Sequence, residues 1–266
     1  MLENMDRRIA SILLGDRKYS EMDGKLFFIK PVGDIDSVKV FLKKFPRIYE
    51  TLIYVTTTIF FYGMSAEEAM RKAYGDIRDR KIIVNLGSGT SDFAGGVINV
   101  DAFPYPSVNI VADATRLPFK DASVDMVISE SMLEHVPLPE RAIAEMRRII
   151  KPGGYLYLEL PFMYPYHASP KDFTRFTIEG LSEELGDSFE IVAAGARSGP
   201  FSALIIQAMY ALSLLLSLGS KRAYSLLLQI CMVALAPLKV FDFFYIPLED
   251  SHEAASHIYF FAKKRR

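Results

Sequence analysis

The strongest constraint on the fold is a regular alternation of short apolar runs and helical patterns that begins near residue 81. Each run has the length of a β-strand, and apolar residues at helical spacing lie between some of them, as in residues 139–150. Strands that alternate with helices predict an α/β fold whose sheet is mostly parallel and doubly wound. The expected strands cover residues 81–86, 97–101, 108–113, 124–129, 155–160, 189–194 and 257–262, and the expected helices cover 65–79, 139–150 and 178–185.

The ends of the expected elements carry local signals. Ser65 can cap the first helix, with Glu68 three residues later as in a capping box. Residues 152–154, Pro-Gly-Gly, should separate the helix 139–150 from the strand at 155. Residues 26–29 are a further candidate strand, because the Asp23-Gly24 turn precedes them.

Composition excludes several classes of protein. The 266 residues carry a net charge of −1, which argues against a protein that coats nucleic acid. Cys231 is the only cysteine, so an intramolecular disulfide and a cysteine-based zinc site are excluded. Residues 1–10 contain four charged side chains, and no apolar run of signal-peptide length follows. We therefore expect a cytoplasmic protein with one elaborated domain and no nucleic-acid partner.

Three polar signals follow successive expected strands. Gly87 and Gly89 lie directly after the first strand, where glycines let the backbone approach a ligand closely. Asp101 ends the second strand, and an acidic side chain there can accept hydrogen bonds from ribose hydroxyls. Asp113 follows the third strand. Each signal alone fits a tight turn or a helix cap, but together they indicate a ligand site at the carboxyl edge of the sheet.

Four segments together resemble the class I S-adenosylmethionine-dependent methyltransferases, type 11 branch. They read VNLGSGTSD, INVDA, VADATRLPFKDASVDMVISESMLEHV and EMRRIIKPGGYLYLELP, and the resemblance covers about residues 80–195. It implies a Rossmann-like, seven-stranded sheet whose last strand is antiparallel, and S-adenosylmethionine as the cofactor.

The resemblance also implies roles for single residues. Gly87 and Gly89 would face the methionine and ribose parts of the cofactor, and Asp101 would hold the ribose hydroxyls. Ala102 and Asp113 would lie beside the adenine. The other residues that the resemblance assigns to cofactor binding are Asn85, Ser88, Ala114, Ser129 and Glu130. Two positions depart from the family pattern, because Asn85 replaces an acidic residue and Ser91 replaces a common third glycine.

Other functions of the same fold remain open. Eight residues separate Gly89 from Ile98, so the crossover helix should be reduced to about one turn. A nicotinamide dehydrogenase fits less well, because a dinucleotide needs a helix N-terminus for its pyrophosphate. A non-catalytic binding protein that keeps the fold is a second alternative, supported by Asn85, Ser91 and the short crossover.

The acceptor side is expected in residues 161–177, which are long and aromatic for a connection at this edge. The segment resembles an HxSPxDFxRFT stretch of methyltransferases found with cell-surface glycan and lipid genes. His167 is a candidate general base, and Asp172 and Arg175 could orient it or simply staple a lid. His135 is a second candidate base, whereas His252 and His257 are interpreted as structural. No cluster has spacing that indicates a metal site.

An apolar insertion precedes the last strand. Residues 198–220 contain no charged side chain, and residues 223–238 are uncharged again after Lys221-Arg222. Serines and a tyrosine share one side of the first run, so each helix would have a thin polar stripe and a wide apolar face. This pattern favours a hairpin lying in the membrane interface over helices buried in a homodimer or against the sheet, and over true spanning. The basic residues 263–266 would suit an anionic leaflet.

These patterns divide the chain into four parts: an N-terminal extension (1–64), the cofactor-binding core (65–197), the insertion (198–250), and the last strand with the basic tail (251–266). We expect a methyltransferase that is peripheral on the inner face of the cell membrane, with a lipid-linked saccharide or another hydrophobic acceptor. The alternative is a soluble small-molecule enzyme whose insertion forms a lid or a homodimer contact.

Overall fold

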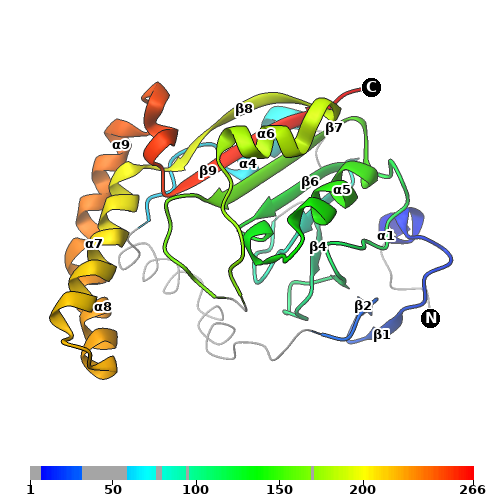
Figure 1. Cartoon of the computed structure of the whole chain (residues 1–266). Coiled ribbons are helices and arrows are strands. Elements are labelled where there is room, and N and C mark those ends of the chain that lie inside the picture. The colour runs from blue at the N-terminus through cyan, green and yellow to red at the C-terminus, as the bar shows by residue number, and fades with distance from the viewer. Residues whose placement is uncertain (1–6, 32–58, 76–79, 94–95, 169–170) are drawn as a thin grey trace.

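The computed structural model describes residues 7–31, 59–75, 80–93, 96–168 and 171–266 (Figure 1). Most of the proposed extension 1–64, and the last residues of the expected helix 65–79, lie outside this part of the chain. The strands are β1 (Ser20–Met22), β2 (Lys25–Phe27), β3 (Ile83–Leu86), β4 (Ile98–Asp101), β5 (Ile110–Val111), β6 (Val124–Glu130), β7 (Ile150–Pro161), β8 (Phe189–Ser198) and β9 (His257–Lys264). The α-helices are α1 (Arg7–Ile12), α4 (Ala66–Tyr74), α5 (Pro139–Ile149), α6 (Ile178–Leu185), α7 (Pro200–Leu216), α8 (Lys221–Leu235) and α9 (Asp242–Tyr245).

The strands form one sheet in the order β1-β2-β5-β4-β3-β6-β7-β9-β8. Strands β3 to β7 are mutually parallel, and β9 runs antiparallel to both β7 and β8. The prediction of a doubly wound sheet with an antiparallel last strand is therefore confirmed. The chain proceeds outward from β3 to β5 and then returns to β6 on the other side of β3. This reversal creates a topological switch point at the carboxyl ends of β3 and β6, where open α/β sheets bind ligands.

Two further strands extend the sheet beyond the seven expected ones. β2 pairs in parallel with β5, and β1 closes the edge as the antiparallel arm of a hairpin. The two turn residues, Asp23 and Gly24, both have positive φ, as a tight two-residue hairpin requires. The N-terminal region is therefore partly built into the sheet.

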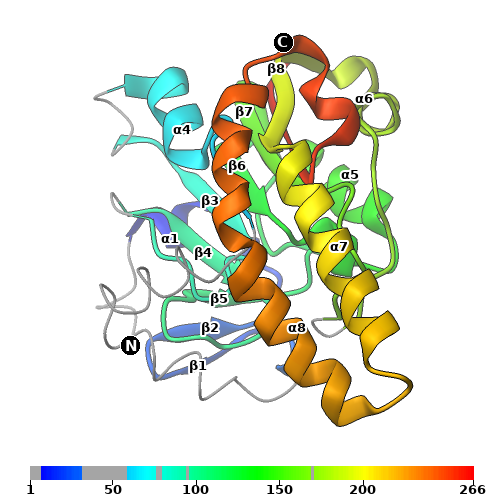
Figure 2. The ribbon, with the colours of Figure 1, turned by 90° about the vertical axis from the view of Figure 1, so that its left-hand side faces the viewer.

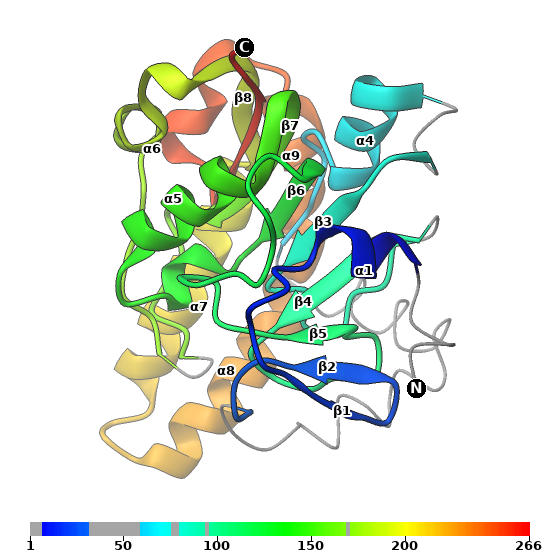
Figure 3. The same cartoon turned by 90° about the vertical axis from the view of Figure 1, so that its right-hand side faces the viewer.

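Helices cover both faces of the sheet. The larger hydrophobic core lies on the face that α1, α5 and α6 cover, where Ile12, Met146 and Leu181 are almost fully buried. The smaller core lies under α4, with Ala69 and Met70 against the sheet. Figure 3 shows α1 and α5 in front of the strands, opposite the side from which Figure 2 is drawn.

Several element limits differ from expectation, and three of the differences have a local cause. α4 ends at Tyr74, because Gly75 adopts φ +51° and its N–H caps the helix; at the other end Ser65 accepts from the Glu68 N–H as predicted. β7 begins at Ile150 rather than 155, because the strand continues through the Pro-Gly-Gly segment. Its pairing with β6 shifts register there. The crossover after Gly89 contains no helical turn in its described residues, since eight residues leave too little chain.

The apolar insertion forms an antiparallel helical hairpin, α7 and α8, joined to the short helix α9. The two long helices lie side by side along one side of the molecule (Figures 1 and 2). The carboxylate of Asp242 caps the start of α7 by accepting from the N–H groups of Phe201 and Ser202 at 2.8 and 2.9 Å. Asp242 is fully buried, so this cap fixes α9 against the root of the hairpin.

Candidate active site

A pocket of about 690 Å³ opens at the switch point of the sheet. Its lining comes mainly from the segments that follow β3, β4, β5 and β6, with one histidine from the segment after β7. Ten of the twelve site residues predicted from the sequence line it: Gly87, Ser88, Gly89, Asp101, Ala102, Asp113, Ala114, Glu130, His135 and His167. The residues after four parallel strands therefore converge on one cavity, as the strand-end argument predicts.

The segment after β3 has a backbone that requires glycine. Gly87 and Gly89 have φ of +74° and +54°, a conformation that residues with a Cβ rarely adopt. A Cβ at Gly87 would also lie 2.2 Å from the Met132 side chain across the pocket. At Gly89, by contrast, no atom lies within 4 Å of the position that a Cβ would occupy, so its backbone faces open space.

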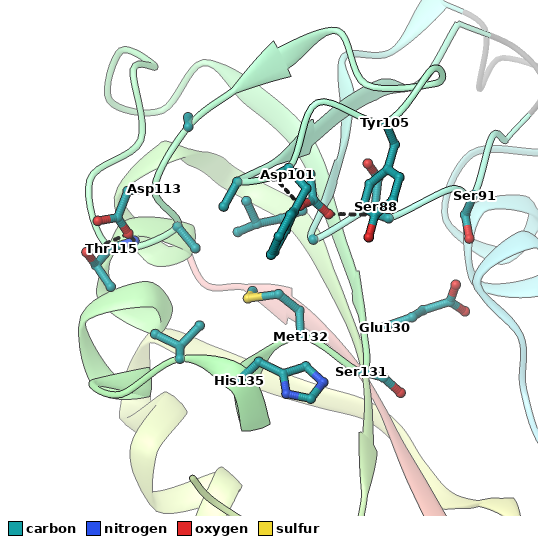
Figure 4. A pocket seen from close by; sticks show the side chains of 18 of the residues that line it. Ser88, Ser91, Asp101, Tyr105, Asp113, Thr115, Glu130, Ser131, Met132 and His135 are labelled. Atoms are coloured by element: carbon teal, nitrogen blue, oxygen red, sulfur yellow. Dashed lines mark hydrogen bonds between the residues drawn. The ribbon is translucent and has the colours of Figure 1, made fainter. Parts of the chain in front are cut away.

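Asp101 joins the two loops at the centre of the pocket. Its carboxylate accepts from the Gly89 N–H at 2.7 Å and from the Phe103 N–H at 2.8 Å. Burial raises the pKa of Asp101, and these backbone hydrogen bonds oppose the rise. Figure 4 shows Asp101 across the cavity from Met132, with His135 beyond it. The carboxylate oxygens keep lone pairs that can accept from a diol.

A buried hydroxyl beside Asp101 has no partner. The Oγ atom of Ser88 lies in the pocket wall, is buried, and makes no hydrogen bond within the described part of the chain. A buried polar group without a partner costs free energy, and because Ser88 belongs to the pocket lining, a ligand that displaces the side chain slightly could supply this partner. Cofactor binding at this loop therefore fits the residues present.

Asp113 lies at the outer end of the pocket and is exposed. Its Oδ1 accepts from both the N–H and the hydroxyl of Thr115 at 2.8 Å, which fixes the turn after β5. Asp113 and its neighbour Ala114 both line the pocket, and Figure 4 shows Asp113 beside Thr115. The position suits recognition of an amino group at the edge of a ligand.

A group of charges lies behind the carboxyl end of β6. Glu159 pairs with Arg197 at 3.2 Å, and Glu130 lies on the neighbouring strand. Burial, and then the charge of Glu159, raise the pKa of Glu130 to about 8. Burial also raises the pKa of Glu159, but Arg197 opposes that rise. The two neighbouring carboxyls therefore disfavour each other's ionisation, and Arg197 offsets this most at Glu159.

The segment 161–177 crosses the pocket and is stapled as a loop. Arg175 forms a bidentate ion pair with Asp172, and the His167 N–H donates to the same carboxylate at 2.9 Å. The hydrogen bonds from the Arg175 guanidinium lower the pKa of Asp172 to about 2, and the hydrogen bond from the His167 backbone N–H acts in the same direction. His167 and His135 stand edge to face, with ring centroids 5.0 Å apart. Both interpretations of Asp172 are thus compatible: it staples the loop and lies 3.4 Å from His167 Nδ1.

Two predicted cofactor residues do not line this pocket. Asn85 is buried within β3 and donates to Asn99 on β4 at 3.2 Å. Ser129 is buried within β6. An amide pair between neighbouring strands accounts for Asn85 as a structural residue. His257 is also buried, and desolvation lowers its pKa to about 3, in keeping with the structural role expected for it.

Several lining residues were not singled out from the sequence. They are Ile29, Phe103, Tyr105, Thr115, Ser131, Met132, Val136, Pro137 and Leu138. Phe103 and Tyr105 follow Asp101 closely, so two aromatic rings after a strand-end acid could have been a signal. Ile29 comes from the segment after β2, far away in the sequence, and no local pattern connects it with the pocket.

Comparison with known proteins agrees with this geometry. A family model described as "Methyltransferase domain" matches residues 88–158. A demethylmenaquinone methyltransferase of Renibacterium salmoninarum is 36% identical over 100 residues, which cover 32% of this chain and 42% of the relative. An uncharacterized methyltransferase of Mycobacterium marinum is 43% identical over 124 residues, covering 37% of this chain and 49% of the relative. A crystallised phosphoethanolamine N-methyltransferase 2 of Haemonchus contortus is 17% identical, with a TM-score of 0.42, covering 74% and 56% of the two chains.

Sheet order, glycine loop and family match define the class of this part of the chain. Residues 88–158 match the methyltransferase-domain model, and the sheet order and glycine loop are those that the resemblance to the class I, type 11 methyltransferases implies. The chain spans less than half the length of the two curated relatives given above.

Proposed function

We propose that the protein transfers a methyl group from S-adenosylmethionine to a hydrophobic acceptor at a membrane surface, such as a lipid-linked saccharide. The observation that carries the transfer is the convergence of Gly87, Gly89, Asp101 and the unpartnered Ser88 hydroxyl on one cavity. The cofactor supplies an activated methyl group when it is bound, so the protein's part is alignment and exclusion of water.

Residues on one wall of the pocket would bind the cofactor, and residues on the opposite wall would activate the acceptor. The loop at Gly87 and Gly89 lets the backbone approach the cofactor, while Asp101 accepts from ribose hydroxyls and Asp113 meets the adenine edge. His135 and His167 line the remaining wall. An imidazole there can take the proton of an oxygen or nitrogen acceptor as the methyl group arrives.

The hairpin carries the membrane part of the proposal, because its polar side is turned inward. Ser213 of α7 and Ser217 at its C-terminal cap are 0 and 4% exposed, whereas Leu214 and Leu215 of α7 and Leu218 in the following turn are 68, 70 and 93% exposed. A helix on the surface of a protein in water normally shows the opposite pattern. The apolar side chains would instead enter the interfacial region of a bilayer.

Other residues extend this apolar surface. No residue of α8 is fully buried, and its exposed apolar side chains include Leu226, Ile230 and Val233. Phe243 and Phe244 of α9 continue the surface. Lys221 and Arg222 begin α8 and are exposed, so they can contact lipid headgroups.

The position of the hairpin relates it to the pocket. β8 runs parallel to β7, so α7 begins at the same edge of the sheet as the cofactor loops. An acceptor held in a membrane under the hairpin would therefore meet the methyl donor at that edge. The basic tail follows β9 to the opposite edge, where Lys264 donates to the carbonyls of Arg147 and Ile150. The tail is therefore not part of this surface (Figure 1).

Length alone would also permit a membrane span. The continuous helical stretch Lys221–Tyr245 has 25 residues and contains an 18-residue window of mean hydropathy 1.8, so it is long and apolar enough to cross a bilayer. α7 is shorter, with 17 residues, and both flanking strands belong to one sheet. We therefore favour a hairpin that lies on the inner face of the cell membrane of a cytoplasmic protein. The second candidate is a soluble enzyme whose exposed leucines meet a second copy or close over a small acceptor.

Methyl-labelled S-adenosylmethionine tests the proposal. The purified protein is incubated separately with membrane and soluble extracts of its host, and labelled products are fractionated. We expect label in a membrane-extract product that Asp101→Ala abolishes. Label confined to soluble metabolites would overturn the membrane acceptor and support the lid or homodimer alternative. No transfer in either extract, together with no cofactor binding, would overturn the enzyme itself.

A further inference from the structure

We propose that Glu134, His135 and His167 bind one divalent transition-metal ion, such as Zn²⁺, in the wall of the pocket. The spacing of these residues along the chain does not predict an ion, because His167 is distant from the other two. In the structure one ligand atom from each residue lies within 4.8 Å of the others.

The orientation of both imidazoles leaves their Nε2 atoms directed at one carboxylate. His135 Nδ1 lies 2.6 Å from the carbonyl oxygen of Lys171, which can only accept, so Nδ1 carries the proton. His167 Nδ1 lies 3.4 Å from the Asp172 carboxylate. The Nε2 atoms of His135 and His167 then face Glu134 Oε1 at 3.7 and 3.6 Å. The Lys171 carbonyl is an outer partner of the kind that fixes the tautomer of histidines that bind metals. The Nδ1 atom of His167 makes no hydrogen bond within the described residues, but Asp172 is near enough to accept one after a small rotation of the ring.

The buried carboxylate of Glu134 has no hydrogen-bond donor among the described residues. Its side chain is 1% exposed, and neither carboxylate oxygen receives a hydrogen bond from the described part of the chain. A buried carboxylate without a partner is strongly unfavourable, so positive charge is needed beside it. Neutral imidazoles offer lone pairs instead of protons, and a cation between the three groups would satisfy all of them.

The distances suit an ion better than direct hydrogen bonds. A charge-assisted N–H···O bond would be about 2.7–2.9 Å, much shorter than the observed separations. Ligand atoms about 2.1 Å from a tetrahedral Zn²⁺ are about 3.4 Å apart, so small rotations of the imidazoles would complete the site. Two histidines and one carboxylate are a ligand set for Zn²⁺ and other divalent transition metals, and leave positions open for another ligand.

An open position at this place has a chemical consequence. His135 and His167 line the cofactor pocket, so an acceptor oxygen could occupy the open position next to the methyl donor. A divalent ion lowers the pKa of an oxygen bound to it, and the ionised oxygen is the better nucleophile. The histidines would then hold the ion in place of acting as the base, and the proton of the ion-bound acceptor would pass to water in the pocket. The ionised oxygen would form its bond to the methyl group as the methyl–sulfur bond of the donor breaks.

Metal binding can be measured without the cofactor, so this test is independent of methyl transfer. Untagged protein is stripped with a chelator and titrated with Zn²⁺ by calorimetry, and with Co²⁺ by visible absorption. We expect one ion per chain. Glu134→Gln and His167→Ala should each weaken Zn²⁺ binding by about 100-fold or more, and Asp172→Asn by about 10–100-fold as an outer-partner effect.

His252→Ala is the matched control, because His252 lies outside the pocket and its Nδ1 contacts the carbonyl of Glu249. Its Zn²⁺ affinity should equal that of the wild type. Circular dichroism establishes that each variant is folded, and His167, whose side chain is 30% exposed, provides a test if Glu134→Gln does not fold. Absence of stoichiometric binding by the wild type, or equal affinity in the His167 variant, would overturn the proposal and leave Glu134 paired with protonated histidine.

Discussion

At the scale of single residues, the pocket depends on conformations and charges that only a few side chains permit. Gly87 combines positive φ with close contact to Met132, so its lack of a Cβ serves both the turn and the pocket wall. Asp101 connects the two loops through backbone hydrogen bonds. Glu130 and Glu159 share a buried environment in which Arg197 neutralises only one of them.

Gly87→Ala should abolish measurable cofactor binding and destabilise the fold. Positive φ alone costs a residue with a Cβ about 1–2 kcal/mol, and the clash with Met132 adds to this. The measurements are calorimetric titration with S-adenosylmethionine and urea unfolding. Gly153→Ala is the control, because Gly153 also has positive φ but has open space around it, away from the pocket. The Gly153→Ala variant should lose stability but bind the cofactor with wild-type affinity. Wild-type affinity in Gly87→Ala would contradict the role given to Gly87.

Glu130 should make stability fall as pH rises. Its pKa is about 8 in the folded protein and near 4.5 when unfolded, so between these values the folded state binds a proton that the unfolded chain lacks. The stabilising contribution is complete below pH 4.5 and is lost as pH rises through about 8. Thermal melts from about pH 5 to 9 should show a shallower decline for Glu130→Gln than for the wild type. Glu190→Gln, on the exposed part of β8, should keep the wild-type slope; equal slopes in all three would show that Glu130 is not protonated at neutral pH.

At the scale of elements, local signals predicted where most strands and helices begin but not how they end or pair. The helix 178–185 has the predicted limits, and in the structure Thr177 caps its start and Gly186 follows its end. β7 starts five residues early because an irregularity in pairing, which depends on the neighbouring strand, absorbs the glycines. The pairing of β2 with β5 is likewise a long-range contact that no periodicity encodes.

The hairpin α7–α8 is the element that the membrane proposal depends on. Leu215→Glu should reduce cosedimentation with vesicles containing anionic lipid by about fivefold or more, because a charge would replace an apolar group at the bilayer interface. Leu215 is 70% exposed, so the melting temperature should hardly change.

Ile191→Glu is the matched control for this variant, since Ile191 is an exposed apolar residue on β8, 44% exposed and outside the hairpin. It should cosediment like the wild type. Equal loss in both variants would indicate nonspecific binding. Wild-type protein that remains in the supernatant would contradict the interfacial hairpin and direct attention to a homodimer.

At the scale of the whole molecule, the parallel sheet gathers distant residues at one edge. The parallel sheet with its antiparallel last strand was predicted from the alternating pattern and the resemblance, and ten of the twelve predicted site residues line the pocket. The cluster of Glu134 with His167 could not, because it depends on how the loop after β7 returns over the pocket. The inward orientation of the α7 serines also needed the structure, since periodicity defines a stripe but not the side it faces.

Calorimetric titration of S-adenosylmethionine into the purified protein tests the central claim most directly. We predict one site per chain, lost in Asp101→Ala and retained in Ser129→Ala, because Asp101 lines the pocket and Ser129 is buried within β6. Binding that survives Asp101→Ala in a folded variant would mean that the cofactor is held elsewhere. No binding by the wild type would contradict the account and leave the fold as a scaffold without its donor.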